Sequence, residues 1–401
     1  MARESSQARL ALAAVTVMIS CQCGAPSENR TLETEGGDDV TQPPGNPADI
    51  DPFTEDTAKT PPALERVPVE PPPITLSSRS HAGRLGDKAA VVARDRPSDT
   101  SLFTTLDDRG RWSSPARLPF MGPFAVEDCH GTFIVGGGTD DDIAYFVISG
   151  EGTVLRELEV DLPELPLGLP VIACAASGPA FVWLNTFTSL GIQTRQWRAD
   201  LELEGDTETL AAAAAGDKIV VMRAYSDRPD AVAKLEALVV EDGSIKARTA
   251  VGDEPRTSHL NLLSRDGYLL AVWGSHVDDS IRTRVLAEDL SRMGPVHVIH
   301  RAGGRVMRVR GAESAGGKIA LMWSEEVGDG VVGGDGRMRK SEGHRAALLD
   351  SFGRKLGPKT LILPRAGQYR HVAWAGEHLL GYGGGRSARV ERYAPAEPPA
   401  R

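Results

Sequence analysis

The stretch Ser264-Arg265-Asp266-Gly267-Tyr268-Leu269-Leu270-Ala271-Val272-Trp273 decides the fold, because the chain repeats its pattern. A polar or small run leads into a glycine turn, and an apolar run that ends at tryptophan follows. Clear copies are Ala175-Ala176-Ser177-Gly178 before Phe181-Val182-Trp183, and Gly316-Gly317 before Ile319-Ala320-Leu321-Met322-Trp323. Fainter copies turn at Gly86, Gly131, Gly216 and Gly376. Glycine permits the positive φ of a tight turn, and a short apolar run after it is typical of a buried strand.

The turn glycines recur at intervals of 38 to 59 residues. A repeat of about 48 residues has room for four short strands, which is the content of a β-propeller blade. The 43 glycines and 27 prolines also favour an all-β chain with many turns. We therefore predict an all-β, seven-bladed β-propeller over residues 74–395, with six or eight blades as alternatives and a disordered tail at 396–401.

The seventh copy of the repeat lacks a fourth strand, because the chain ends soon after Val390-Glu391-Arg392-Tyr393. A closed ring needs that strand, since an open edge would be left unpaired. Ile74-Thr75-Leu76-Ser77-Ser78 lies just before the first copy and alternates apolar with polar residues. This N-terminal segment is therefore predicted to close the ring as the outer strand of the last blade.

The charge of the chain is concentrated before the repeats. The net charge is −10, and residues 24–73 alone hold eleven acidic and three basic residues together with eleven prolines. Such a segment buries too little apolar surface to offset the entropy of ordering, so residues 21–73 are predicted to form a disordered tether. The repeats themselves are nearly neutral and contain no basic run, which argues against a nucleic-acid partner.

The first twenty residues have the pattern of a signal peptide. Arg3 and Arg9 precede an apolar run over residues 10–19, which is too short to span a bilayer as a helix. Met18-Ile19-Ser20-Cys21 resembles the lipobox of bacterial lipoproteins. The resemblance implies that Cys21 is lipidated and that the protein is exported and anchored at the bacterial outer membrane or cell surface. A periplasmic or secreted protein with a chance cysteine, and a chain that is not exported, are the alternatives.

Short motifs within the repeats resemble those of known propeller families. Phe133-Ile134-Val135-Gly136-Gly137 and Leu379-Leu380-Gly381-Tyr382-Gly383-Gly384 resemble the kelch pattern, and residues 105–112 resemble the Asp-box turn of sialidase-like propellers. The chain as a whole resembles propeller-bearing bacterial lipoproteins. This resemblance implies a fold and a location, and a fold does not imply a function.

Cys129 and Cys174 lie two and four residues before their turn glycines, on the predicted innermost strands of neighbouring blades. Even offsets place both side chains on the same face of their strands. In an oxidising compartment they are able to form a disulfide that joins the second and third blades. Two buried free thiols are the alternative.

Several polar residues are candidates for the central channel or for a binding loop. No catalytic residue, cofactor or metal site is predicted, because no catalytic constellation can be assembled and Asp140-Asp141-Asp142 lacks the spacing of a calcium loop. The glycine-rich insertion at residues 324–345 is either a mobile loop or a binding loop for a partner or an anionic ligand. The channel candidates are Asp128, His130, Arg310, Arg370 and His371, and the loop candidates are Arg337, Arg339 and Lys340.

The function that these features favour is a membrane-anchored lipoprotein of the cell envelope whose propeller is a platform for binding a protein or a polymer. A propeller enzyme of the lyase or glycosidase type that acts on polysaccharide is the first alternative. A structural component of an envelope assembly is the second. Few aromatic side chains are present to stack on sugar rings, and no carboxylate pair is recognisable, so the binding platform is preferred.

Overall fold

The computed structural model describes residues 64–75, 80–95, 98, 100–138, 143–163, 166–228, 232–253, 255–265, 267–275, 277–302, 306–315, 318–332, 338–350, 352–356, 361–363, 368–375, 378–384 and 389–395. The elements in these ranges are all β-strands. Within the same ranges, no helix is long and apolar enough to cross a membrane. The predicted signal peptide, Cys21, most of the predicted tether, and the tail at 396–401 lie outside the described residues.

The described strands pair into seven four-stranded antiparallel sheets. Sheet 1 is β2 (Ser80–Leu85), β3 (Lys88–Asp95), β4 (Thr100–Leu106) and β5 (Ala116–Leu118); sheet 2 is β6 (Met121–Cys129), β7 (Thr132–Gly138), β8 (Ile143–Ile148) and β9 (Val154–Leu158). Sheet 3 is β10 (Val171–Ala175), β11 (Gly178–Thr186), β12 (Ser189–Gln193) and β13 (Arg198–Glu202); sheet 4 is β14 (Asp206–Ala215), β15 (Lys218–Ser226), β16 (Lys234–Glu241) and β17 (Ser244–Asp253). Sheet 5 is β18 (Pro255–Arg265), β19 (Tyr268–Ser275), β20 (Ser280–Ala287) and β21 (Met293–Arg301); sheet 6 is β22 (Val306–Ala315), β23 (Lys318–Val332), β24 (Met338–Leu349) and β25 (Leu361–Leu363). Sheet 7 is β26 (Gln368–Ala375), β27 (His378–Gly384) and β28 (Arg389–Pro395), completed by β1 (Leu64–Val67).

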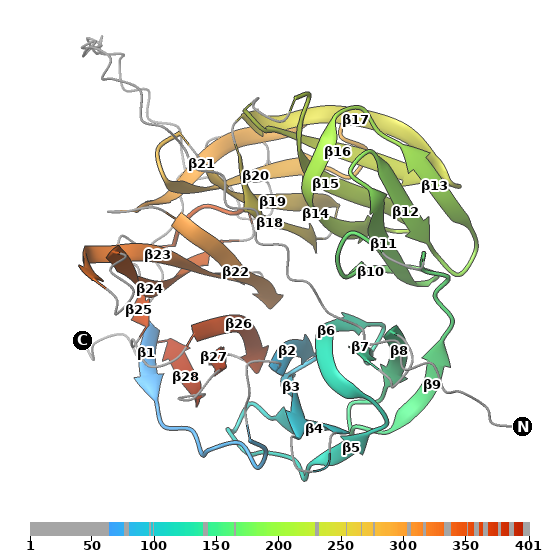
Figure 1. Cartoon of the computed structure of the whole chain (residues 1–401). Helices are drawn as coiled ribbons and strands as arrows, with labels where there is room; N and C mark the ends of the chain where they lie inside the picture. Colours follow the sequence, from blue (N-terminus) through green and yellow to red (C-terminus); the bar gives the residue numbers. More distant parts are fainter. Residues whose placement is uncertain are drawn as a thin grey trace, which may run out of the picture. The chain divides into compact units, whose positions relative to one another are not determined.

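The innermost strands contact one another in a closed circle, in the order β2, β6, β10, β14, β18, β22, β26 and back to β2. Figure 1 shows these strands around the centre of the ring, with the later strands of each sheet farther out. The prediction of an all-β propeller built from four-stranded sheets is confirmed. Lys234–Glu241, which could be drawn as a helix from its sequence, is also a strand as predicted.

In sheets 1 to 6 the second strand is buried between neighbouring sheets over most of the length whose side chains are described, which explains its continuous apolar run. All eight residues of β19 are buried. Val220 and Met222 of β15 belong to the same core cluster as Leu269 and Ala271 of β19, so this core joins two consecutive sheets. The inner strand β14 is lined by buried alanines at 211–215, because small side chains let neighbouring sheets approach closely near the centre.

Trp183, Trp273 and Trp323 lie within the second strands β11, β19 and β23 and are fully buried. The indole of Trp183 lies over Gly191 of β12, where an added Cβ would stand 2.3 Å from the ring. A side chain at this position would displace the ring, so only glycine fits there. Each of the three tryptophans also belongs to a core cluster that two consecutive sheets share, so the tryptophans pack sheets together, as their place in the repeat predicts.

The strand that closes the ring is not the predicted one. β1 (Leu64–Val67) pairs antiparallel with β28, from Leu64 opposite Pro395 to Val67 opposite Arg392. The predicted segment at 74–78 is not that strand: Ile74 is buried in a core cluster with residues of β3 and β26, and residues 76–79 lie outside the described residues. The predicted tether boundary at residue 73 is therefore wrong, since the folded unit includes residues from Leu64 onward.

The chain between β1 and β2 is fixed to sheet 1. The indole Nε1 of Trp112 donates a hydrogen bond of 2.9 Å to the carbonyl oxygen of Glu70. Val69 and Trp112 both pack against the cluster that contains Ile74. An apolar anchor after β1 thus replaces the predicted strand, and the closing strand itself lies ten residues earlier.

Candidate functional site

Hydrogen bonds between neighbouring sheets link the turns at one end of the ring, which we call the turn face. This end carries the β6–β7, β10–β11 and β14–β15 turns. The amide of Ala176 donates to the carbonyl oxygen of Gly216 at 2.8 Å, and the amide of Ser177 donates to Oδ1 of Asp217 at 2.7 Å. His130 Nε2 donates to the carbonyl oxygen of Ala175 at 2.7 Å. Sheets 2, 3 and 4 are therefore tied to one another at this end.

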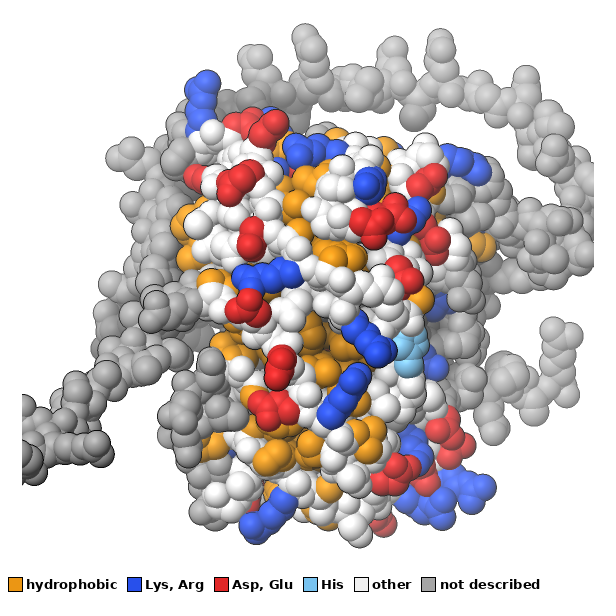
Figure 2. All heavy atoms as spheres, turned by 90° about the vertical axis from the view of Figure 1, so that its right-hand side faces the viewer, with side chains coloured by type: hydrophobic (Ala, Val, Ile, Leu, Met, Phe, Trp, Pro, Cys, Tyr) orange, Lys and Arg blue, Asp and Glu red, His pale blue; other side chains and the backbone are white. Residues whose placement is uncertain are grey.

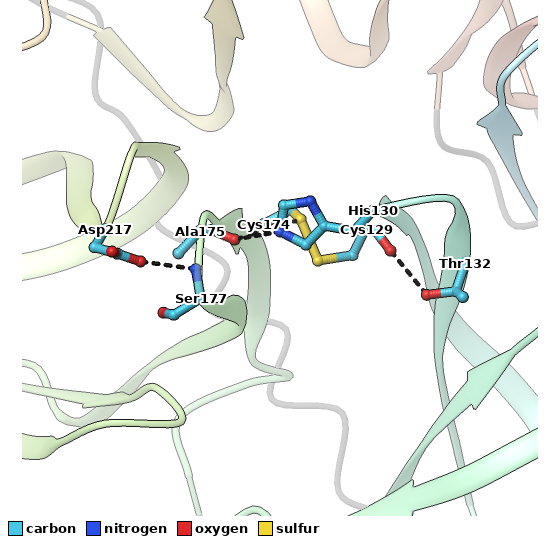
Figure 3. The surroundings of a disulfide bond; sticks show 7 residues. All are labelled: Cys129, His130, Thr132, Cys174, Ala175, Ser177 and Asp217. Carbon is cyan, nitrogen blue, oxygen red and sulfur yellow. Dashed lines mark hydrogen bonds between the residues drawn. A yellow bond between two sulfur atoms is a disulfide. The ribbon is translucent and has the colours of Figure 1, made fainter.

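A disulfide joins Cys129 of β6 to Cys174 of β10, with a Cα–Cα distance of 5.3 Å. Of the two alternatives for these cysteines, the structure has the bonded pair on adjacent inner strands. Figure 3 shows the bond at the turn face, with the His130 imidazole beside it. Cys129 is buried, Cys174 is half-buried and His130 is exposed, so the cluster opens to solvent on its histidine side.

His130 lies one residue beyond its predicted strand, in the turn between β6 and β7. Its φ is 51° and that of the following Gly131 is 76°. Two consecutive positive φ values form the tight hairpin turn in which glycine, asparagine or aspartate is usually found. This left-handed backbone directs the imidazole across to sheet 3, where it reaches Ala175.

Two carboxyl groups on β6 lie next to this cluster. The Glu127 side chain is exposed at the surface, but protein atoms crowd around its carboxyl, and this desolvation, with the charge of Asp128, raises its pKa to about 7. Desolvation also raises the pKa of Asp128, against the opposing effects of a hydrogen bond from the Gly131 amide and the charges of Arg84 and His130. Glu127 is a residue that the sequence analysis missed, because an acidic residue in an inner strand has no distinguishing motif.

The remaining channel candidates lie on inner strands, as predicted, and are described by their backbone. Arg310 belongs to β22, and Arg370 and His371 belong to β26. The structure brings Asp128 and His130 together, with Arg84 of sheet 1 close enough to interact with Asp128. Asp140-Asp141-Asp142 lies outside the described residues.

The insertion at residues 324–345 is not a loop over its described length. β23 and β24 continue their pairing far beyond the sheet, from Ser324 opposite His344 to Val332 opposite Met338. A two-stranded ribbon therefore extends from sheet 6. Arg339 and Lys340 lie on its β24 strand, and Arg337 lies outside the described residues.

A buried carboxylate lies at the base of this ribbon. Glu325 of β23 is 1% exposed and bonds to His300 Nε2 of sheet 5 at 2.9 Å and to Arg345 Nε of β24. Burial alone would raise its pKa, but the hydrogen bonds and charges of His300 and Arg345 hold the pKa below its ordinary value. The cluster joins sheet 5 to sheet 6, since the ring of His300 also packs against Trp323 at 5.1 Å.

The end of the ring opposite the turn face carries the described connections at 159–163, 166–170, 187–188, 227–228, 232–233 and 277–279, and we call it the loop face. Backbone hydrogen bonds hold two of these connections, the one at 187–188 against residues 203 and 207 and the one at 166–170 against β11. Thr207, next to the start of β14, donates to the Phe187 carbonyl at 2.7 Å, and Leu203 donates to the Thr188 carbonyl at 2.8 Å. The amide of Leu167 donates to the carbonyl of Leu184 at 2.9 Å.

Exposed apolar side chains are concentrated on the loop face. Among the described residues, eight large hydrophobic side chains are exposed, and five of them lie on loop-face connections next to or within sheets 3, 4 and 5. These five are Leu167, Leu169, Phe187, Val232 and Val277. The other three, Leu155, Val296 and Val298, lie on the outer strands β9 and β21. No sequence motif marks the five, although an apolar residue between polar turn residues, as in Thr186-Phe187-Thr188, is a signal of such exposure.

Charged side chains accompany this apolar set. Asp278 is next to Val277 and pairs with Arg282 at 3.0 Å and with Arg301 at 2.9 Å. On the outer side of the ring that Figure 2 shows, basic and acidic side chains are interspersed, with hydrophobic side chains between them. That side therefore carries no extended field of one sign.

The chain matches no protein-family model and no curated protein sequence. Among solved structures, it is similar to BBS1N in a crystal structure of its complex with ARL6DN, soaked with mercury. The sequence identity is 11%, the match covers 84% of this chain and 98% of that chain, and the TM-score is 0.49. It is also similar to the WD40 domain of SCAP from fission yeast, at 9% identity, 84% and 98% coverage and a TM-score of 0.44. The fold described above follows from the strand pairing of this chain itself.

Proposed function

We propose that this protein is an exported, lipid-anchored platform that binds a protein partner on the loop face of its ring. No catalytic step is part of the proposal. The observation that carries it is the gathering of exposed apolar side chains at one end of three consecutive sheets. Phe187 is 56% exposed and Val277 is 63% exposed. A partner that docks on this end of the ring would cover these side chains and remove their apolar surface from water.

The backbone of these connections is suited to binding because it is already ordered. Phe187 accepts a hydrogen bond from Thr207 through its carbonyl, and Leu167 donates one to Leu184. A surface that is fixed before binding loses less conformational entropy when a partner docks. The chemistry of the five side chains, four aliphatic and one aromatic, fits a protein surface, since sugars are usually recognised by aromatic stacking.

Charged residues lie beside the exposed apolar ones, where the polar rim of a protein interface would be. Asp278 and Arg301 form an ion pair next to Val277, and Arg301 is largely exposed. A protein interface typically has an apolar centre surrounded by polar, solvent-accessible residues. Such a rim contributes more to the choice of partner than to affinity.

Membrane attachment is proposed from the N-terminal sequence. Cys21 follows an apolar signal-like run in a lipobox-like motif, and a proline-rich acidic segment separates it from β1. The disulfide between Cys129 and Cys174 suits an oxidising compartment, which supports export. Two or more acyl chains would hold the protein stably at a membrane.

The binding proposal is tested by site-specific photo-crosslinking in the full chain. A photoreactive residue replaces Phe187 or Val277, and a matched control replaces Leu155, which is 55% exposed on the outer strand β9. We expect one crosslinked protein species at both loop-face positions and none at Leu155. The variant Phe187→Glu, Val277→Glu should abolish the species when crosslinking is read from Val232, whereas Leu155→Glu should not. Equal crosslinking at Leu155 and Phe187 would contradict the proposal.

Anchoring is tested separately by labelling with palmitate in a bacterial host. We expect label in the wild-type chain and none in Cys21→Ser. A Cys23→Ser variant is the matched control, because it removes a neighbouring thiol and should leave the label in place. An unlabelled wild-type chain would overturn lipid attachment and leave the binding face unaffected.

A further inference from the structure

The cluster of Cys129, His130 and Cys174 holds three side chains of the types that bind soft metal ions. One ligand atom from each, the two Sγ atoms and an imidazole nitrogen, lies within 4.8 Å of the others. The two cysteines come from different sheets, and their backbones are fixed by strand pairing, with Cys129 opposite Thr132 and Cys174 opposite Pro179. The ligand atoms are therefore brought together by the ring and not by a local sequence motif.

We propose that this cluster is a binding site for a zinc ion, which it takes up when its disulfide is reduced. The oxidised chain holds the sulfur atoms in a covalent bond, so the site is closed in that state. Reduction frees two thiols beside an imidazole, which makes a Cys2His ligand set on the turn face. This proposal rests on the cluster of Cys129, His130 and Cys174, whose disulfide also supports export, and it does not depend on the binding face.

The size of the cluster fits zinc. Zinc binds cysteine sulfur at about 2.3 Å and histidine nitrogen at about 2.0–2.1 Å, so ligand atoms around one tetrahedral ion lie about 3.3–3.8 Å apart. The three atoms already lie within 4.8 Å of one another, and the Cα atoms of the two cysteines are 5.3 Å apart. Rotation about the side-chain bonds is sufficient to reach tetrahedral geometry without moving the strands.

The placement of His130 is the second observation that favours a ligand. Its positive φ is uncommon for a residue with a side chain, and it brings the ring against the two sulfur atoms (Figure 3). In the oxidised chain its Nε2 donates to the Ala175 carbonyl, and this hydrogen bond would be exchanged for the metal. The exposed imidazole and the half-buried Cys174 give both the reductant and the ion a path to the site.

The types of ligand atom in the cluster determine which ion it prefers. Two thiolates and one imidazole favour zinc over magnesium or calcium, which prefer oxygen ligands. Three protein ligands leave the fourth position of zinc open to water or to another ligand.

The reaction is balanced with a dithiol as the reductant. The dithiol passes two electrons and two protons to the Cys129–Cys174 bond, which breaks to give two thiols, and the dithiol itself becomes a disulfide. Binding of the zinc ion then releases both thiol protons to water as the two thiolates and the imidazole coordinate the metal.

Cobalt titration of the full chain tests the proposal, in a Cys21→Ser, Cys23→Ser background that leaves only the two ring thiols. We expect the reduced protein to bind one cobalt ion, with a sulfur-to-cobalt charge-transfer band and the visible bands of a tetrahedral site, and zinc to displace it. The oxidised protein should give neither band. His130→Ala should weaken binding at least tenfold, whereas His297→Ala, on the outer strand β21, should bind as the parent does.

Two results would overturn the proposal. One is a reduced, folded protein without the charge-transfer band, and the other is a His130→Ala variant that binds cobalt as tightly as the parent. If reduction unfolds the chain, its thermal melting is measured with zinc and with magnesium. Zinc should then restore a cooperative melting transition and magnesium should not, and equal behaviour of the two ions would reject the site.

Discussion

Arg223 is a charged side chain that is almost completely buried, and each of its three guanidinium nitrogens donates a hydrogen bond. Its Nε donates to Oε1 of Glu236 at 2.5 Å, and its other nitrogens donate to Thr207 Oγ1 and to the Glu204 carbonyl, each at 2.7 Å. The guanidinium also lies 4.1 Å from the centre of the Tyr225 ring. The side chain thus connects three strands of sheet 4 to the connection before it.

We predict that Glu236→Ala lowers the free energy of unfolding by about 3–5 kcal/mol, because it leaves a buried guanidinium without its counter-charge. Urea unfolding followed by tryptophan fluorescence measures the change. Asp227→Ala is the matched control, since it breaks the exposed Lys234–Asp227 pair of the same sheet and should cost far less. Equal effects of the two substitutions would show that burial of the Arg223 pair is unimportant.

Glu127 makes the stability of the ring depend on pH. Its pKa in the folded chain is raised to about 7 from an ordinary value of 4.5. The folded state therefore binds this proton more tightly than the unfolded state does, so its contribution to stability falls as the pH rises from about 4.5 to about 7. Above that range the contribution changes no further.

We predict that Glu127→Gln reduces the loss of thermal stability between pH 5 and pH 8, because glutamine has no proton to release. Melting temperatures of both proteins at the two pH values measure this. Asp128 is present in both proteins, so its effect on the pH dependence of the melting temperature is the same in both. If the wild type and Glu127→Gln lost the same number of degrees, the raised pKa of Glu127 would be refuted.

At the scale of elements, one turn recurs between the third and fourth strands of different sheets. Oδ1 of Asp107 accepts hydrogen bonds from the amides of Arg109 and Arg111, and Oδ1 of Asp350 accepts them from Phe352 and Arg354, all at 2.8–3.0 Å. In the corresponding turn of sheet 2, the hydroxyl oxygen of Ser149 accepts the two amide hydrogen bonds. Its sequence signal is faint because only an acceptor and a later glycine with positive φ recur.

We predict that Asp350→Ala lowers stability by about 1–2 kcal/mol, because two amides of the turn lose their acceptor. Asp350→Asn keeps an acceptor oxygen at this position and should lose clearly less. Denaturant unfolding of the two variants side by side measures the difference. An Asn variant as unstable as the Ala variant would mean that the charge of Asp350, and not its hydrogen bonds to the turn, is what matters.

The sequence predicts the central strands well and the irregular ones poorly, for physical reasons. A buried strand such as β19 needs a continuous apolar run, and that run is visible in the sequence. β1 has four residues within a proline-rich segment, and it is a strand because the edge of β28 is available to it. The ribbon of β23 and β24 is held by backbone pairing, which glycines do not prevent, so its glycine-rich sequence predicts a loop where the structure has two paired strands.

The sequence also predicts the candidate sites only in part. Cys129 and Cys174 were placed on neighbouring inner strands from their offsets to the turn glycines, and the structure has them there. The approach of His130 to the two sulfur atoms depends on the backbone of one turn, which the sequence does not reveal. Phe187 and Val277 are apolar residues in the sequence, and only the fold shows that they face solvent.

At the scale of the whole molecule, β1 completes the last sheet of the ring. It contributes four residue pairs to β28, whose outer edge would otherwise be open. Tyr393 of β28 is buried within the cluster that joins sheets 6 and 7. The integrity of the ring therefore depends on a segment more than 300 positions away in the sequence from its partner.

We predict that a chain lacking residues 1–67 melts at least about 5 °C below the full chain, which corresponds to about 3–4 kcal/mol for a protein of this size. A chain lacking residues 1–60 keeps β1 and should melt like the full chain. Differential scanning calorimetry of the three proteins measures this. Identical melting of the two shortened chains would show that β1 is dispensable.

The pairing of Leu64 with Pro395 brings the first and last residues of the ring to the same point on one sheet. A mechanical force applied between the two flanking segments would act across the end of this strand pair, perpendicular to it. The hydrogen bonds between β1 and β28 would then break one after another from that end. Under shear along the strands they would break all at once. The ring would part at this junction under a small pull, while the disulfide and the linked turns held sheets 2, 3 and 4 together.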